Sequence, residues 1–280
     1  MTTARLEELC PVWNVAPANA SGRETFHPIY DTCRLGDDES GDEPPLLILG
    51  GNAVPAEELK SRGVTHILSL LALKRGQKPA AESAGDEFER HVVDIEDDYD
   101  SDLVSVLPSA HNFIDKARSS GGLCYVHCEM GRSRSAATVI SWLMHWRKQN
   151  GRPASFIDCY AAVASRRRIT ALNYGFAATL CDFEVELGAA KTSLPLLKYF
   201  QLMQHPSCGI FRFTPVPEFH ELLREVGAAL DDKARTSYLE STPRDLSIRK
   251  ALRGFVHVLR ALSPTSPTCR ETLKILNVEE

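Results

Sequence analysis

The stretch from Leu123 to Trp146, LCYVHCEMGRSRSAATVISWLMHW, constrains the fold more than any other part of this chain. It begins with an apolar run, LCYVH, that is long enough for one buried strand, and it ends with a helix that is apolar on nearly all sides from Ala136 to Trp146. The loop between them carries one thiol, one glycine and two guanidinium groups. Backbone N–H groups point into such a loop, and the dipole of the following helix adds partial positive charge. The stretch therefore predicts an anion-binding strand–loop–helix unit.

Cys128 lies at the floor of this loop, where its thiol is not expected to keep an ordinary pKa. Nearby N–H donors, a helix N-terminus and Arg134 all favour the thiolate, and such surroundings lower a cysteine pKa from about 8.5 to about 3.5–7.5. The planar guanidinium of Arg134 can hold two oxygens of a tetrahedral anion. Ser135 offers a hydroxyl beside the sulfur, and His127 can orient the loop backbone from behind. A nucleophile, an anion cradle and a bidentate clamp together indicate phosphoryl transfer through a cysteinyl-phosphate.

The same residues resemble the signature of a known family. HCEMGRSRS (127–135) matches the His-Cys-x-x-Gly-x-x-Arg-Ser pattern of cysteine-dependent protein tyrosine phosphatases, and its Ser-Arg-Ser ending with the following AATVISWLM is similar to the dual-specificity branch. The resemblance implies a phosphatase that needs no metal and no other cofactor. Ser135 would ease the departure of the sulfur. Six residues would bind the substrate phosphate: Glu129, Met130, Gly131, Arg132, Ser133 and Arg134.

An acidic segment, 96–102, is expected to supply the general acid. The leaving oxygen must receive a proton and a water must later lose one, and a single carboxylic acid over the pocket can do both. The family's acid follows an aliphatic-Glu pair, so the resemblance implies that Asp97 is the acid in Ile95-Glu96-Asp97. Asp98 and Asp100 are its competitors. Asp102 is predicted to be the N-cap of the next helix instead.

A downstream segment resembles the part of the family that supports the loop. The family pattern is Arg-Pro, a spacer and Pro-Asn-x-Gly-Phe; here Arg167 falls on the arginine, and Asn173 opens the matching Asn-Tyr-Gly-Phe. The resemblance therefore implies that Arg167 and Asn173 support the site together with His127. Arg168 and Leu172 replace the two prolines, and Thr179 stands where glutamine is usual. The arginines at 166–168 either widen anion recognition or form a solvated helix end.

The remaining pattern predicts an α/β fold with a mainly parallel central sheet flanked by helices. The site is expected at the carboxyl end of the strand that carries His127. LLILGG, VTHILSLL (64–71) and FERHVVDI (88–95) are predicted strands, and a short helix between the first two ends at Gly63. Helical spacing of apolar residues predicts a helix from Leu103 to Ala117, in which Pro108 causes either a kink or a later start. The order strand, short helix, strand also resembles the entry to a dual-specificity phosphatase domain.

Length, charge and cysteine content limit the number of domains, the kinds of partner and the cellular compartment that this chain can have. The 280 residues have room for one medium domain and a second small one, and the net charge of −5 supplies no basic field for nucleic acid or anionic membranes. No run approaches 18 apolar residues, so no membrane insertion is expected. Eight scattered cysteines without a CxxC pair indicate a reduced protein of the cytoplasm or the nucleus. Cys124 is either a redox partner of Cys128 or a small strand residue.

These patterns divide the chain into three predicted regions. The resemblance covers residues 44–190, which are therefore expected to form the dual-specificity phosphatase catalytic domain; 1–43 are expected to form an N-terminal extension with an acidic linker, and 191–280 a helical C-terminal region. In the last region, Pro217–Leu230 is predicted to be an amphipathic helix, and Thr242-Pro243 opens another with an apolar stripe at Leu252, Phe255, Val256 and Leu259. Thr268 and Glu271 suggest a capping box for a final helix. These helices dock on the catalytic domain, pack together or recruit a partner, and the apolar stripe favours docking.

The function predicted from the sequence is hydrolysis of phosphotyrosine and phosphoserine or phosphothreonine in a phosphorylated protein, a protein kinase being one candidate substrate. Two alternatives stay open. The first is a phosphatase for a non-protein phosphate, such as a phosphoinositide or an RNA 5′ phosphate; a polyanionic inositol ring would favour lysines in the loop, which instead carries Glu129 and Met130 with Arg132. The second is a phosphoprotein-binding adaptor without turnover, although the nucleophile, the clamp and the acid are all present.

Overall fold

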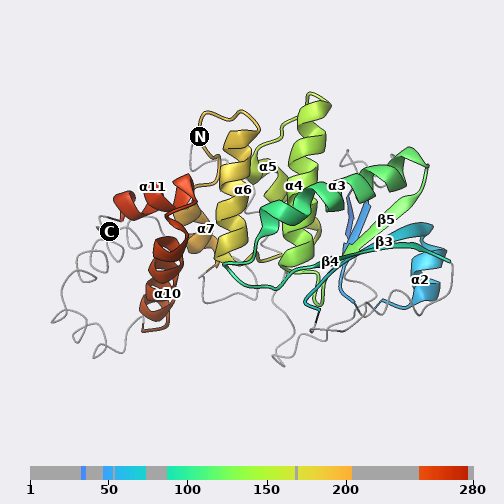
Figure 1. The fold of residues 1–280 in the computed structure, drawn as a ribbon, viewed down its shortest axis with the longest axis horizontal. Coiled ribbons are helices and arrows are strands. Elements are labelled where there is room, and N and C mark those ends of the chain that lie inside the picture. Colours follow the sequence, from blue (N-terminus) through green and yellow to red (C-terminus); the bar gives the residue numbers. More distant parts are fainter. Residues whose placement is uncertain are drawn as a thin grey trace. The chain divides into compact units, whose positions relative to one another are not determined.

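The computed structural model describes residues 33–35, 47–52, 54–73, 87–167, 170–203 and 246–276 (Figure 1). The chain divides into two compact units, residues 1–176 and residues 177–280. The predicted helix at 217–230 and the predicted helix start at 242–243 lie outside the described residues. The boundaries at 43/44 and 190/191 stay predictions.

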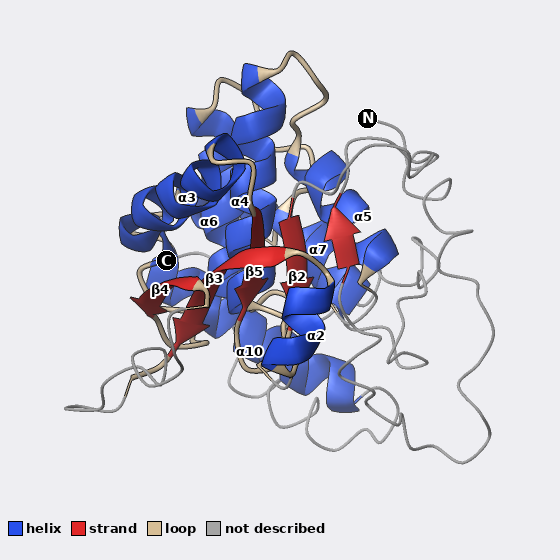
Figure 2. Ribbon diagram, turned by 90° about the vertical axis from the view of Figure 1, so that its right-hand side faces the viewer, coloured by secondary structure: helices blue, strands red, loops and turns tan. Residues whose placement is uncertain are grey.

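A five-stranded sheet forms the centre of the first unit (Figure 2). Its strands are β1 (Cys33–Leu35), β2 (Leu47–Gly50), β3 (Val64–Leu71), β4 (Glu89–Asp94) and β5 (Leu123–His127), in the spatial order β1-β2-β5-β3-β4. β2, β5, β3 and β4 run parallel, and only β1 among these strands is antiparallel to its neighbour. The mainly parallel sheet predicted from the sequence is therefore confirmed, and β5 occupies its middle.

Strand register brings three carboxyl ends together at one edge of the sheet. Gly50 of β2 and Ser69 of β3 are the register partners of His127, the last residue of β5. The strands are apolar enough to be covered on both faces, and Leu47, Ile48 and Leu49 of β2 are fully buried. Loops that leave this edge start close together, which is where open parallel sheets place their ligands.

Helices cover the two faces of the sheet. His66 of β3 contacts Phe113 of α3 (Leu103–Ser119), with ring centroids 5.5 Å apart. Its neighbour Ile67 points to the opposite face, because side chains alternate along a strand. There Ile67 packs in one buried cluster with Leu59 of α2 (Ala56–Ser61). The cover is completed by α4 (Arg134–Gln149), which contacts β5, β2 and β3, and by α5 (Phe156–Arg166), which packs on α4 and β1.

The start of α3 is decided by its N-cap. Asp102 accepts a hydrogen bond from the backbone N–H of Ser105 at 3.1 Å, so the predicted cap is confirmed. The helix then runs without interruption from Leu103 to Ser119 with Pro108 inside it. A later start of the helix, one of the two predicted effects of Pro108, is therefore wrong, because the Asp102 cap already fixes the first turn.

The core helix α4 is buried on nearly all sides, as its sequence predicts. Every residue from Arg134 to Met144 is buried. The helix begins at Arg134, two residues before the predicted start, because the loop that precedes it turns directly into helical backbone. None of the described helices combines the length and the apolarity needed to cross a membrane.

In its described residues the second unit consists of helices and their connections. α6 (Tyr174–Glu186) enters it and is followed by α7 (Leu196–Met203), α10 (Leu246–Leu262) and α11 (Pro267–Ile275). Three residues of the predicted apolar stripe, Phe255, Val256 and Leu259, are buried, and Phe255 stacks on Phe200 with centroids 4.6 Å apart. The side chain of Leu252 lies outside the described part.

The N-terminus of α11 corrects one prediction. Ser266, not Thr268, is the N-cap, and its side chain accepts a hydrogen bond from the N–H of Cys269. Pro267 explains the shift, since proline favours the first helical position. The carboxylate of Asp182 on α6 binds both ends of this turn, accepting from the Ser266 hydroxyl at 2.5 Å and from the N–H of Thr268 at 3.0 Å.

Candidate active site

Cys128 follows the last residue of β5 and lies at the carboxyl edge of the sheet. Its side chain is only 2% exposed. Its sulfur accepts hydrogen bonds from the N–H of Gly131 and from the hydroxyl of Ser135, both at 3.2 Å. The strand places the sulfur, and the first turn of α4 places the hydroxyl beside it.

The surroundings of Cys128 favour its thiolate. Burial raises the pKa of the thiol, but the Ser135 hydroxyl, the N–H groups of Ser135 and Arg132 and the charge of Arg134 together outweigh burial and hold the pKa below its ordinary value. At Cys124 burial dominates instead: it outweighs one backbone hydrogen bond, with Leu68, and raises the pKa of that β5 thiol to about 12. The thiolate therefore forms more readily at Cys128 than at Cys124, where it is suppressed at neutral pH.

Arg167 determines which way the loop's peptides face. Its guanidinium donates to the carbonyl oxygens of Met130 and Gly131, at 2.7 and 2.6 Å. In a planar trans peptide the N–H points opposite to the C=O. The N–H groups of Gly131 and Arg132 are thereby turned toward the Cys128 sulfur, where both stabilise the thiolate. Arg167 thus binds the outside of the loop and leaves the inside to N–H donors.

Glycine is required at position 131 for two reasons. Its φ is +65°, a conformation that residues with a Cβ rarely adopt. A Cβ there would also lie 2.2 Å from the carbonyl oxygen of Gly50 at the end of β2. The loop 128–134 therefore packs directly against the neighbouring strand end.

His127 holds the loop from behind. Burial lowers its pKa to about 4, so the ring is neutral at physiological pH. Nδ1 lies 3.3 Å from the carbonyl oxygen of Cys128, which can only accept, so Nδ1 carries the proton. Nε2 must then accept from the hydroxyl of Ser69, 2.7 Å away. Sequence reasoning missed Ser69; the signal is its register position beside His127, which appears only once β3 and β5 are paired.

Arg134 is the first residue of α4 and carries a buried guanidinium with only long contacts, among them a hydrogen bond from Nη1 to the carbonyl oxygen of Ile95 at 3.5 Å. The side chain is 7% exposed. Its Nε has no hydrogen-bond partner among the described residues, and the nearest carboxylate oxygens, on Asp97 and Glu129, lie 3.8 and 3.7 Å from its nitrogens. A buried cation that is only partly hydrogen-bonded is costly. The group is therefore suited to hold a bound anion.

Asp97 is the carboxylate of the acidic segment that reaches the loop. One of its oxygens accepts from the Ser133 hydroxyl at 2.6 Å and from the side-chain amide of Asn173 at 2.9 Å. The competitor Asp98 instead accepts from the N–H of Tyr99, in its own turn. Ser133 is the N-cap residue of α4 but makes no side-chain cap bond, which leaves its hydroxyl for Asp97.

The segment around Asn173 also shapes the acidic loop. Asn173 donates to the Asp98 carbonyl at 3.3 Å, and its backbone N–H donates to the Ser133 hydroxyl at 3.2 Å. A Cβ on Gly175 would lie 1.8 Å from the carbonyl oxygen of Tyr99, so the backbones approach too closely for any other residue. The structure thus brings together residues 97–99, residues 127–135, and Arg167 with residues 173–175, which the sequence analysis assigned to one site.

The open side of the loop carries charges of both signs. Glu129, Met130 and Arg132 are exposed, whereas Ser133, Arg134 and Ser135 are buried. No group of three or more metal-ligating side chains occurs in the described part of the chain.

Replacement of Ser135 by alanine is expected to move the pH dependence of Cys128 alkylation to higher pH. The hydroxyl that stabilises the thiolate is lost, so the burial that raises the thiol pKa is less completely offset. Iodoacetamide labelling followed by mass spectrometry measures the rate at each pH, with Cys124 of the same protein as the unreactive reference. An unchanged or lower midpoint would contradict this account of the thiol.

Residues 47–186 match the family model described as "Dual specificity phosphatase, catalytic domain". Among similar proteins, "Protein phosphatase Slingshot homolog 1" of Homo sapiens is 36% identical over 156 residues, which cover 54% of this chain and 14% of that protein. "Dual specificity protein phosphatase 1B" of Arabidopsis thaliana is 35% identical over 126 residues, covering 45% and 69%. "Dual specificity protein phosphatase 1" of the same plant is 34% identical over 140 residues, covering 49% and 65%.

Proposed function

This chain belongs to the dual specificity phosphatase family, and we propose that it hydrolyses phosphotyrosine and phosphoserine or phosphothreonine in proteins through a cysteinyl-phosphate on Cys128. The observation that carries this proposal is the convergence of three groups on one loop. They are a buried thiol with a lowered pKa, the buried guanidinium of Arg134, whose Nε has no hydrogen-bond partner among the described residues, and the Asp97 carboxylate held against Ser133.

In the first step the Cys128 thiolate attacks phosphorus in line with the leaving oxygen. The Arg134 guanidinium and the N–H groups of residues 129–134 hold the three equatorial oxygens of the phosphoryl group, so negative charge is stabilised where it is concentrated. Asp97 donates its proton to the leaving alkoxide or phenoxide as that bond breaks. The products of this step are the free hydroxyl, cysteinyl-phosphate and the Asp97 carboxylate.

In the second step water attacks the cysteinyl-phosphate. The Asp97 carboxylate takes a proton from this water, the new P–O bond forms, and the sulfur leaves as thiolate. The Ser135 hydroxyl, 3.2 Å from the sulfur, donates to the charge that develops there. Arg167, Asn173 and His127 position the loop and the acid in this scheme. No metal or other cofactor takes part in it.

The exposed side of the loop favours a phosphoprotein over the phosphoinositide or RNA alternative. A polyanionic headgroup needs several cations around the scissile phosphate, but the exposed loop residues are Glu129, Met130 and Arg132. A carboxylate at the mouth repels a second phosphate. The adaptor alternative is disfavoured because nothing in the proposed machinery is missing. A cytoplasmic or nuclear location, a protein kinase as substrate and the docking or recruiting role of residues 191–280 stay predictions.

A substrate panel tests this proposal on the full-length protein in EDTA. Matched phosphotyrosine and phosphothreonine peptides are compared with phosphoinositide vesicles and with 5′-triphosphorylated RNA, by phosphate release. We expect both peptides to be hydrolysed with a higher kcat/KM than the lipid or the RNA. A preference for the lipid or the RNA would overturn the substrate class, and phosphopeptide binding without any phosphate release would favour the adaptor.

A further inference from the structure

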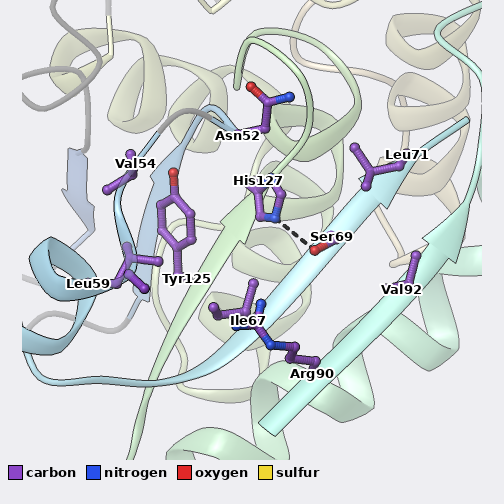
Figure 3. A pocket seen from close by; sticks show the side chains of 11 residues that line it. Asn52, Val54, Leu59, Ile67, Ser69, Leu71, Arg90, Val92, Tyr125 and His127 are labelled. Atoms are coloured by element: carbon purple, nitrogen blue, oxygen red, sulfur yellow. Dashed lines mark hydrogen bonds between the residues drawn. The ribbon is translucent and has the colours of Figure 1, made fainter. Parts of the chain in front are cut away.

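A second hollow lies on the face of the sheet that α2 covers. This cavity has a volume of about 320 Å³, and its lining includes Asn52 and Val54, which follow β2 (Figure 3). Side chains of β3, β4 and β5 form its floor, and Leu59 of α2 lines one side. Neither Cys128, Arg134 nor Asp97 lines it. It is therefore separate from the phosphate-binding loop.

The lining is mostly apolar with a few polar groups, the usual composition of a small-molecule site. Apolar side chains come from Val54, Leu59, Ile67, Leu71 and Val92. The polar groups are the hydroxyls of Ser69 and Tyr125, the Asn52 amide, the His127 ring and the Arg90 guanidinium. Arg90 carries the only formal charge among these lining residues at neutral pH, because His127 is neutral.

Arg90 lacks a counter-ion in the described part of the chain. Its Nε is buried and has no hydrogen-bond partner, and its guanidinium carbon lies 5.4 Å from the ring centroid of Phe88. The charge of Arg90 also acts on His127, which lines the same cavity. Burial lowers the pKa of His127, and the positive charge of Arg90 lowers it further. A cation held against an apolar wall in this way is stabilised by an anion that enters the cavity.

We propose that this cavity binds a small organic carboxylate, with its carboxylate on Arg90 and its apolar body between α2 and the floor of the sheet. A single guanidinium matches the two oxygens of one carboxylate. A phosphate dianion would leave its second charge unpaired beside Val92 and Leu71, so it fits less well. The ligand is thus a monoanion with an apolar body.

An occupant of this cavity would contact the residues that hold the catalytic loop from behind. The Ser69 hydroxyl and His127 are hydrogen-bonded at 2.7 Å, and His127 in turn contacts the Cys128 carbonyl at 3.3 Å (Figure 3). Asn52 donates its backbone N–H to the carbonyl of Glu129 at 3.1 Å. A carboxylate on Arg90 would also oppose the charge that helps to lower the His127 pKa. The site is therefore placed to influence the loop without occupying it.

Binding of sodium 2-naphthoate to the full-length protein, followed by calorimetry, tests the proposal independently of phosphatase activity. We expect saturable binding to the wild-type protein and weaker binding of the neutral analogue 2-naphthamide. Arg90→Gln should weaken naphthoate binding by about 10–100-fold, the usual effect of losing a charged hydrogen-bonding partner. Val92→Phe, which fills the cavity and keeps Arg90, should also remove binding.

Two further variants serve as controls. Arg62→Gln removes an arginine that pairs with Glu58 on α2 outside the cavity lining, and it should bind naphthoate as the wild type does. Arg134→Gln should also keep binding. Loss with Arg134→Gln but not with Arg90→Gln would move the ligand to the catalytic loop and overturn the proposal. The absence of saturable naphthoate binding to the wild-type protein would also overturn the proposal. Equal affinity of the wild-type protein for naphthoate and naphthamide would do the same, and this comparison does not depend on the folding of any variant.

Discussion

The Cys128→Ser variant is expected to release no measurable phosphate from a phosphotyrosine peptide, yet to bind that peptide with an affinity close to that of the wild type. A serine hydroxyl is not ionised at neutral pH, so the attacking anion is lost. The N–H groups turned inward by Arg167 and the guanidinium of Arg134 remain to hold the phosphate. Phosphate release measured in EDTA, together with calorimetric peptide binding, separates these two effects.

Two companion variants sharpen this test. Cys124→Ser replaces the other thiol of the same stretch, whose pKa is raised by burial to about 12. This variant is expected to keep the phosphatase activity of the wild-type protein. Arg134→Lys is expected to lose activity, because an ammonium group cannot form the two parallel bonds of the guanidinium. Appreciable turnover by Cys128→Ser in EDTA would refute the covalent mechanism.

Asp97→Ala is expected to lower kcat by about 10²–10⁴, the usual contribution of general acid–base catalysis. The loss should be smaller for an aryl phosphate whose leaving group has a low pKa, because such a group departs without needing a proton. Asp97→Asn distinguishes the loss of the acidic proton from the loss of the side chain's position. The asparagine oxygen can still accept hydrogen bonds from Ser133 and Asn173, but the side chain has no acidic proton to donate. Steady-state kinetics with a series of aryl phosphates measures this dependence on the leaving group.

Asp98→Ala is the matched control for this prediction. Its carboxylate accepts from the N–H of Tyr99 within its own turn, so kcat should change little. If Asp98→Ala or Asp100→Ala shows the leaving-group-dependent loss and Asp97→Ala does not, the acid has been assigned to the wrong residue.

Local patterns were predictive wherever the physical cause is local. The apolar run VTHILSLL predicts β3 with its observed bounds, Val64–Leu71. The Asp102 cap was predicted because the capping oxygen and its N–H donor are three residues apart. Two local signals misled. Pro108 does not delay α3, and the capping-box pattern at Thr268 competes with the stronger combination of Ser266 and Pro267.

The strand–loop–helix unit is determined by the sequence alone, because Cys128, Gly131, Arg134 and Ser135 lie within eight consecutive residues. Backbone connectivity keeps them together once β5 and α4 form. The partners of this unit come from far along the chain: Asp97 is 36 residues from Ser133, and Ser69 is 58 residues from His127. Their proximity depends on the order and register of β5, β3 and β4, which no local pattern specifies. The cavity around Arg90 exists for the same reason, since three separate strands and α2 must pack before it has walls.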